Sequence, residues 1–154
     1  YHPDHIYCWK ITAAAFEAAG GAIRYPEIGP TPYRPQRLYY TAFSNRMVKL
    51  FTVLMRLRGQ DPKHAGRNKD IDWTRIGIEP RKLHARIDYR RYWDVKRAAG
   101  AEHPSQGGGP SRSRMLPESF QRRYMATETF IRAFPPVPDG FREYDLFAGV
   151  DVTA

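Results

Sequence analysis

Long segments without regular hydrophobic spacing place the strongest constraint on how this 154-residue chain folds. Residues 25–35 read "YPEIGPTPYRP", with four prolines in eleven residues, so they continue neither a helix nor a central strand. Residues 60–82 are polar and interrupted by proline and glycine. Residues 103–114 read "HPSQGGGPSRSR", a composition typical of flexible linkers. Regular structure must therefore be confined to the stretches between these loops.

Three of those stretches space their apolar residues as one face of a helix does. A proline at the first helical position, serine and aspartate as N-caps, and glycine after the last turn mark their ends. The predicted helices span 3–19, 44–58 and 89–102, with Ser44 and Asp88 as N-caps. The residues expected to face the core are Ile6, Trp9, Ala13 and Phe16 in the first, Met47, Leu50, Phe51, Leu54 and Leu57 in the second, and Tyr92, Val95 and Ala99 in the third.

Three further stretches, 37–43, 84–88 and 126–134, have the aromatic and β-branched composition of strands, and "EYDLFAGVDV" is expected to be a short packed tail. Three short strands cannot cover three helices, and loops of about 20 residues are uncommon inside a compact domain. We therefore expect an incomplete domain, and a chain that starts on Tyr1 rather than on methionine agrees with this.

The composition gives a net charge of +9 at pH 7, which raises the question of a nucleic-acid partner. The lysines and arginines are spread along the chain without a block of five or six, and no nucleic-acid-binding motif accompanies them. A generally basic surface is the favoured interpretation. The single Cys8 excludes an internal disulfide and fits a reducing compartment, and no apolar run is long enough for a membrane span, so we expect a cytoplasmic protein.

The first residues, "YHPDH", bring His2, Asp4 and His5 together at the start of a helix. Imidazole is a common zinc ligand, and an intervening carboxylate can orient a histidine ring. A catalytic zinc site usually takes three protein ligands, and no HExxH, CxxC or second histidine pair occurs. From these residues alone, a helix start capped by polar side chains is favoured over a metal site.

Four stretches resemble, in order, the LmbE-like deacetylases, a zinc-dependent family that includes N-acetylglucosaminyl-phosphatidylinositol deacetylase, mycothiol deacetylase and mycothiol conjugate amidase. "HPDH" before a helix ending "AAFEAAG" resembles the second motif of that family. "RLYYTAFS" resembles its following strand, and "DYRRYWDVKRAAGAEHPSQ" resembles its helix with the downstream His-x-Ser/Thr-Gln. "ETFIRAF" and "YDLFAGV" resemble its closing segment.

The resemblance implies an α/β fold in which residues 1–154 are the C-terminal part of a single Rossmann-like deacetylase domain whose N-terminal half is absent. In the family that half carries His-Pro-Asp-Asp-Glu, which supplies two zinc ligands and the general base. By the resemblance, His5 matches the third Zn²⁺ ligand. His2 matches the histidine that stabilises the oxyanion and protonates the leaving amine, and Asp4 matches the acid that supports both histidines.

The function implied for the whole protein is hydrolysis of the amide in an N-acyl amino-sugar conjugate of the N-acetylglucosamine type, with no nucleic-acid partner and with this fragment inactive alone. The alternatives are a basic nucleic-acid-binding module and a non-catalytic scaffold of the same fold. We interpret Lys96, His103, Gln106 and Glu128 as structural. We also expect His2 and His5 to point the same way from the first helical turn, and apolar surface to be exposed along 37–43 or 44–58.

Overall fold

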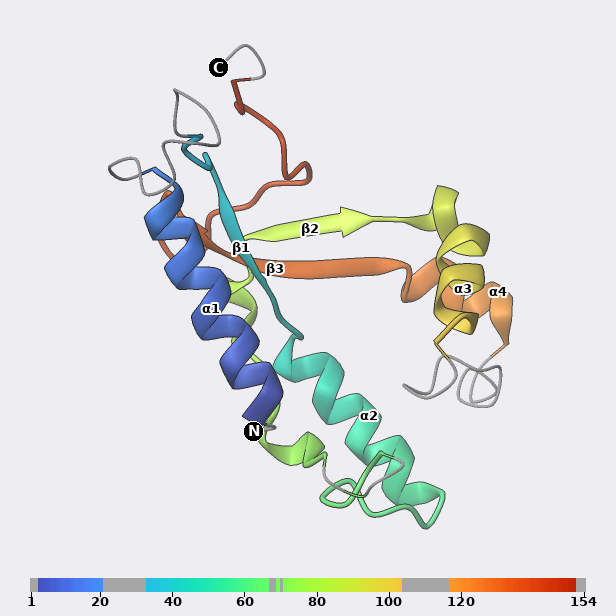
Figure 1. Cartoon of the computed structure of the whole chain (residues 1–154). Coiled ribbons are helices and arrows are strands. Elements are labelled where there is room, and N and C mark those ends of the chain that lie inside the picture. Colours follow the sequence, from blue (N-terminus) through green and yellow to red (C-terminus); the bar gives the residue numbers. More distant parts are fainter. Residues whose placement is uncertain (1–2, 21–32, 67–68, 70, 104–116, 152–154) are drawn as a thin grey trace.

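A computed structural model describes residues 3–20, 33–66, 69, 71–103 and 117–151 of the chain. In this part, helices flank a small antiparallel sheet with the strand order β1-β3-β2 (Figure 1). The elements are α1 (Pro3–Ala19), β1 (Leu38–Thr41), α2 (Asn45–Leu57), β2 (Ala85–Asp88), α3 (Trp93–Ala101), α4 (Glu118–Tyr124) and β3 (Thr127–Phe134). Three 3-10 turns lie at Trp73–Arg75, Pro80–Lys82 and Arg90–Tyr92.

The sheet confirms the three predicted strands and places the longest of them, β3, in the centre. Its residue Phe130 pairs with Thr41 of β1 on one side and with Ala85 of β2 on the other. Successive side chains of β3 point to opposite faces of the sheet, while its backbone bonds to both neighbouring strands. Helices α1 and α2 lie toward the β1 side, whereas α3 and α4 lie beyond one end of β2 and β3 (Figure 1).

The ends of the helices follow the local sequence signals. The Ser44 hydroxyl accepts a hydrogen bond from the Arg46 N–H at 3.3 Å and caps α2, and Gly59 follows its last turn with φ 70°. Asp88 accepts from the Arg90 N–H at 2.9 Å as predicted, but this bond begins a 3-10 turn. The third helix therefore starts at Trp93, four residues later than expected, and α4 was not predicted from sequence at all.

The predicted inward faces of the helices are wrong in several places. In α1, Ile6 and Trp9 are exposed and no residue is buried. In α2, Leu50 and Leu57 are exposed, whereas the buried residues are Val48 and Thr52. The helical period identifies an apolar face, but the buried face depends on what each helix packs against. For α2 that partner is the turn at Trp73–Arg75, whose Trp73 ring lies 6.5 Å from the Phe51 ring.

Helix α3 shows the same kind of correction. Tyr92, Val95 and Ala99 are exposed, and Trp93 is the buried residue. Trp93 lies against α4, where its indole N–H donates to Glu118 at 3.2 Å. Because α4 was missed in the sequence, the face of α3 that meets it was missed as well.

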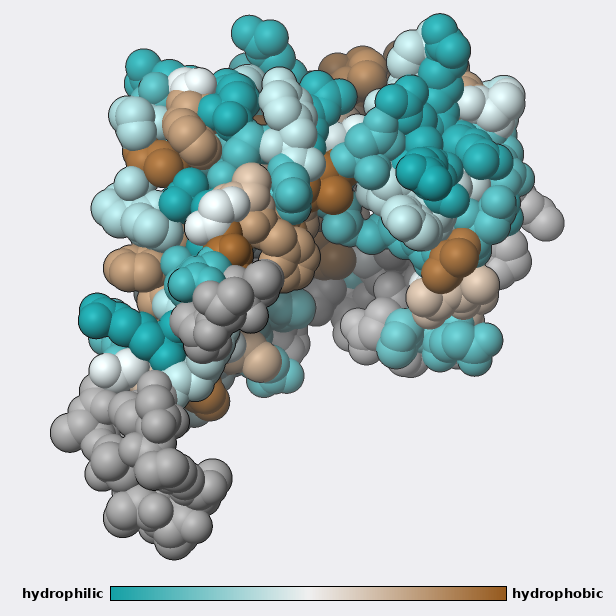
Figure 2. All heavy atoms as spheres, turned by 90° about the horizontal axis from the view of Figure 1, so that it is seen from above, coloured by the Kyte–Doolittle hydropathy of each residue, from teal (hydrophilic) through white to brown (hydrophobic). Residues whose placement is uncertain are grey.

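Few apolar residues are buried in the part of the chain that the structure describes. They are Val48, Ala65, Leu83, Ala85, Trp93 and Ala126, and no large side chain is fully buried there. Hydrophobic side chains reach the surface among hydrophilic ones on the face seen from above (Figure 2). Leu50, Val53 and Leu57 of α2 are exposed, which confirms the expected apolar exposure within 44–58. No helix of the described residues has the length and apolar character needed to cross a membrane.

Candidate functional site

The candidate site begins at the first turn of α1. The helix starts at Pro3, and both Asp4 and His5 are exposed on its first turn. An acidic residue here interacts favourably with the positive end of the helix dipole. Because its side chain is exposed, His5 is not packed inside the core against Phe16. His2 lies outside the described residues, so the shared orientation of His2 and His5 stays a prediction.

Whether this region fits a zinc ion depends on how many metal-binding side chains lie together in it. Within the described ranges, no group of three His, Cys, Asp or Glu side chains is placed to hold a metal ion. A catalytic zinc needs three protein ligands, so the described residues provide a partial site at most. His5 is an accessible imidazole of the right chemistry, and the remaining ligands would have to come from other polypeptide.

The other histidines in the described part have contacts of their own. His64 Nδ1 lies 2.7 Å from Asp61 Oδ2 in an exposed loop. The His84 ring is buried, and its Nδ1 accepts a hydrogen bond from the Arg132 backbone N–H at 3.1 Å. His103 is exposed at the end of α3, where its backbone N–H bonds to the Gly100 carbonyl at 3.2 Å. These placements agree with the absence of a second histidine pair in the sequence.

Lys96 and Glu128, which we interpret from the sequence as structural, form an ion pair that joins α3 to β3. The Lys96 ammonium also lies 4.7 Å from the centre of the Tyr89 ring. The structure therefore gives Lys96 and Glu128 a structural contact, in line with their interpretation as structural residues. Gln106, interpreted in the same way, lies outside the described residues.

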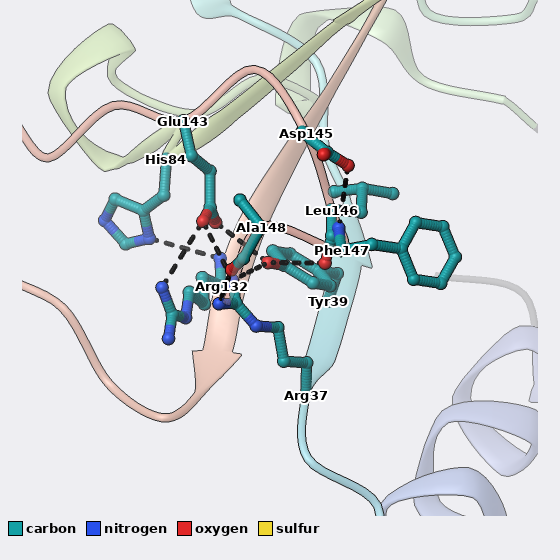
Figure 3. Close-up of polar contacts among 9 residues, drawn as sticks. All are labelled: Arg37, Tyr39, His84, Arg132, Glu143, Asp145, Leu146, Phe147 and Ala148. Carbon is teal, nitrogen blue, oxygen red and sulfur yellow. Dashed lines mark hydrogen bonds and ion pairs between the residues drawn. The ribbon is translucent and has the colours of Figure 1, made fainter. Parts of the chain in front are cut away.

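A second polar cluster, which sequence reasoning missed, surrounds the Glu143 carboxylate (Figure 3). This side chain is only 8% exposed and receives the Arg37 guanidinium at 3.0 Å, the Arg132 guanidinium at 3.3 Å and the Tyr39 hydroxyl at 2.9 Å. Arg37 also donates to the Tyr39 oxygen at 2.9 Å and to the Ala148 carbonyl. We call these four side chains, Arg37, Tyr39, Arg132 and Glu143, the Glu143 network.

The Glu143 network joins the tail to both outer parts of the sheet. Arg37 and Tyr39 come from the β1 segment and Arg132 from β3, while the backbone of Glu143 bonds to His84 O and to the Arg86 N–H beside β2. Gln36 extends the attachment through two hydrogen bonds to the backbone of Asp151, at 2.6 and 2.7 Å. The sequence carried one indication that these segments matter. Both "RLYYTAFS", which includes Tyr39, and the segment near "YDLFAGV", which follows Glu143, resemble family motifs.

The electrostatics of the Glu143 network favour a neutral tyrosine beside charged partners. Burial is the main cause that raises the pKa of Tyr39 above its ordinary value, and the Glu143 carboxylate raises it further. The Tyr39 hydrogen bond is the main cause that raises the pKa of Arg37. The network lies where the tail packs, at the opposite end of β1 from the start of α1, so it is not part of the His5 site (Figure 1).

We expect this tyrosine to make folding stability depend on alkaline pH. An unfolded tyrosine loses its proton near pH 10, whereas the raised pKa of folded Tyr39 keeps the proton bound to higher pH. The unfolded state therefore binds fewer protons above about pH 10, and the free energy of unfolding should fall there. Urea denaturation from pH 8 to 11 should show a shallower fall for Tyr39→Phe than for the wild type. Tyr144→Phe, which changes a 73% exposed side chain, should keep the wild-type slope; equal slopes for all three proteins would contradict the expectation.

Comparison with known proteins connects these segments to curated enzymes. The chain is 28% identical over 151 residues to mycothiol S-conjugate amidase of Streptomyces coelicolor, covering 97% of this chain and 51% of that protein. It is 31% identical over 160 residues to 1D-myo-inositol 2-acetamido-2-deoxy-alpha-D-glucopyranoside deacetylase of Rhodococcus jostii, covering 97% and 50%. The protein of the same name from Thermobifida fusca is 28% identical over 151 residues, covering 96% and 50%.

The chain therefore spans about half the length of the curated relatives that it matches. No family model matches the chain, and no solved structure gives a significant match. The matches extend over nearly the whole chain. The chain is thus similar, over nearly its whole length, to about half of a mycothiol S-conjugate amidase and of two deacetylases, in agreement with the resemblance seen in its sequence.

Proposed function

We propose that the whole protein, of which this chain is the C-terminal part, hydrolyses the amide of an N-acyl amino-sugar conjugate. The observation that carries the proposal is the alignment over 97% of the chain with an amidase and with deacetylases of such conjugates. The start of α1 is exposed and carries His5 on its first turn, so the proposed metal ligand is accessible from outside the chain. The lysines and arginines are spread along the chain without a block of five or six, which gives no particular support to a nucleic-acid partner. Action in the cytoplasm stays a prediction.

The proposed roles follow the order of the motif. His5 would hold a divalent metal ion, with Zn²⁺ as the first candidate, together with two ligands from the Rossmann-like remainder of the domain. Such an ion, when bound, supplies Lewis-acid chemistry at neutral pH. His2 would stabilise the negative charge that develops on the amide oxygen and pass a proton to the leaving amine. Asp4 would support these imidazole rings, which is the role that its place in the motif implies.

The chain described here holds one proposed metal ligand and no general base, so we expect it to be inactive alone. The test compares this chain with the protein that contains its remaining half, each supplied with N-acetylglucosaminyl inositol and assayed for released acetate. We expect acetate from the longer protein, loss of activity after dialysis against a chelator, and recovery when Zn²⁺ is restored. If the longer protein, with any divalent ion, releases a free amino sugar neither from this substrate nor from a mycothiol S-conjugate, the proposal is contradicted.

A further inference from the structure

Helix α1 is apolar on more sides than its neighbours in the described structure cover. Among its seventeen residues only Asp4, Lys10 and Glu17 are acidic or basic apart from His5. One side faces the sheet, where the Phe16 ring lies 5.3 Å from Phe134 and the Trp9 ring 6.5 Å from Tyr40. A helix that is hydrophobic all round is typically buried on all sides. None of the residues of α1 is buried.

The side of α1 that faces away from the sheet has its own regular apolar row. At about 100° per residue, Tyr7 and Ile11 lie nearly opposite Trp9. Tyr7, Ile11, Ala14 and Ala18 follow one another at spacings of four, three and four residues, which keeps them on one face. We call these four residues the outer stripe. Tyr7 is 69% exposed and Ile11 is 57% exposed, so the two large members lie open at the surface.

The charged residues of α1 do not interrupt the outer stripe. Lys10 and Glu17 are seven residues apart and lie on the same flank, between the outer stripe and the sheet side, and Asp4 lies in the first turn before the stripe begins. Figure 1 shows α1 at the edge of the described structure with β1 on one side of it. The helix thus has the pattern of an element packed between two layers, with one layer in place.

We propose that the outer stripe of α1 is the docking surface for the half of the polypeptide that the relatives have and this chain does not cover. The inference rests on the proposed function, which requires that half for the remaining metal ligands. The relatives contain sequence matching 96–97% of this chain within polypeptides about twice as long, so each has further polypeptide available to cover this helix.

The test measures binding and needs no catalysis. The probe is the part of Streptomyces coelicolor mycothiol S-conjugate amidase that the alignment leaves uncovered, produced as a separate polypeptide and titrated against this chain by calorimetry. We expect the wild-type chain to bind and the double variant Tyr7→Asp/Ile11→Asp to bind at least about 100-fold more weakly, because two large apolar anchors are replaced by charges. Val95→Asp, at a 68% exposed position on α3, is the matched control and should bind as the wild type does.

Because the outer stripe is exposed, the double variant should keep the helical circular dichroism of the wild type. Absence of binding by the wild-type chain, or equal binding by the double variant, would overturn the proposal. Self-association of the wild-type chain that the double variant abolishes would overturn it too, by making a second copy the occupant. Binding through the stripe with no hydrolysis by the longer protein would contradict the proposed function and leave the docking surface intact.

Discussion

Replacing Glu143 with alanine should destabilise the fold by about 3–5 kcal/mol, the cost typical of removing one partner from a buried ion pair. The change would leave the guanidinium groups of Arg37 and Arg132, which are 13% and 12% exposed, without their shared carboxylate. It would also remove the acceptor of the Tyr39 hydroxyl. Urea denaturation followed by far-ultraviolet circular dichroism gives the free energy of unfolding for the variant and the wild type.

The matched control for this prediction is Glu79→Ala. Glu79 pairs with Arg81 at 2.8 Å, but both side chains are more than half exposed, and such surface pairs contribute about 1 kcal/mol or less. A Glu143→Ala effect as small as that of Glu79→Ala would show that the Glu143 network does not hold the tail to the sheet. An intermediate variant, Glu143→Gln, keeps an acceptor oxygen and should lie between the wild type and Glu143→Ala.

In the protein that includes the remaining half, His2→Ala should lower kcat by roughly 10²–10³, the usual cost of losing one donor to a developing oxyanion. The physical reason is that the proposed His2 contact forms mainly in the transition state, so substrate binding should change less than the rate. Asp4→Asn should lower kcat by a smaller factor, since it acts through the orientation of the histidines. Steady-state assays of acetate release give kcat and KM for each variant.

His64→Ala is the control for His2→Ala, because His64 lies in an exposed loop beside Asp61 and has no proposed role in the reaction. It should retain the wild-type kcat. If His64→Ala and His2→Ala reduce kcat equally, the loss would reflect a general effect of removing histidines and would contradict the role of His2.

The sequence predicted the positions of the strands and most of the helices well, because local signals determine them. Pro3, Ser44 and Gly59 mark helix ends through backbone geometry and capping, which depend on few neighbours. The aromatic and β-branched composition of β3 likewise favours a strand without knowledge of its partners. Helix α4 was missed because its seven residues, "ESFQRRY", carry too few apolar positions to show a period.

The buried faces and the Glu143 network could not be predicted in the same way, because they depend on contacts between distant segments. Arg37 and Glu143 are separated by 106 residues, and nothing in the spacing of either segment indicates that they meet. The expected inward face of α1 failed for a related reason. Its apolar residues surround the helix, so the sequence identifies no single buried side.

The content of bound metal in His5→Ala and His2→Ala, measured by mass spectrometry on the protein with both halves, tests the central claim most directly. The claim is that His5 is a ligand and His2 is not. We expect His5→Ala to lose most of its bound metal, because a site reduced from three protein ligands to two binds weakly, and His2→Ala to retain about the wild-type amount. Loss of metal in His2→Ala with full metal and full activity in His5→Ala would contradict the claim.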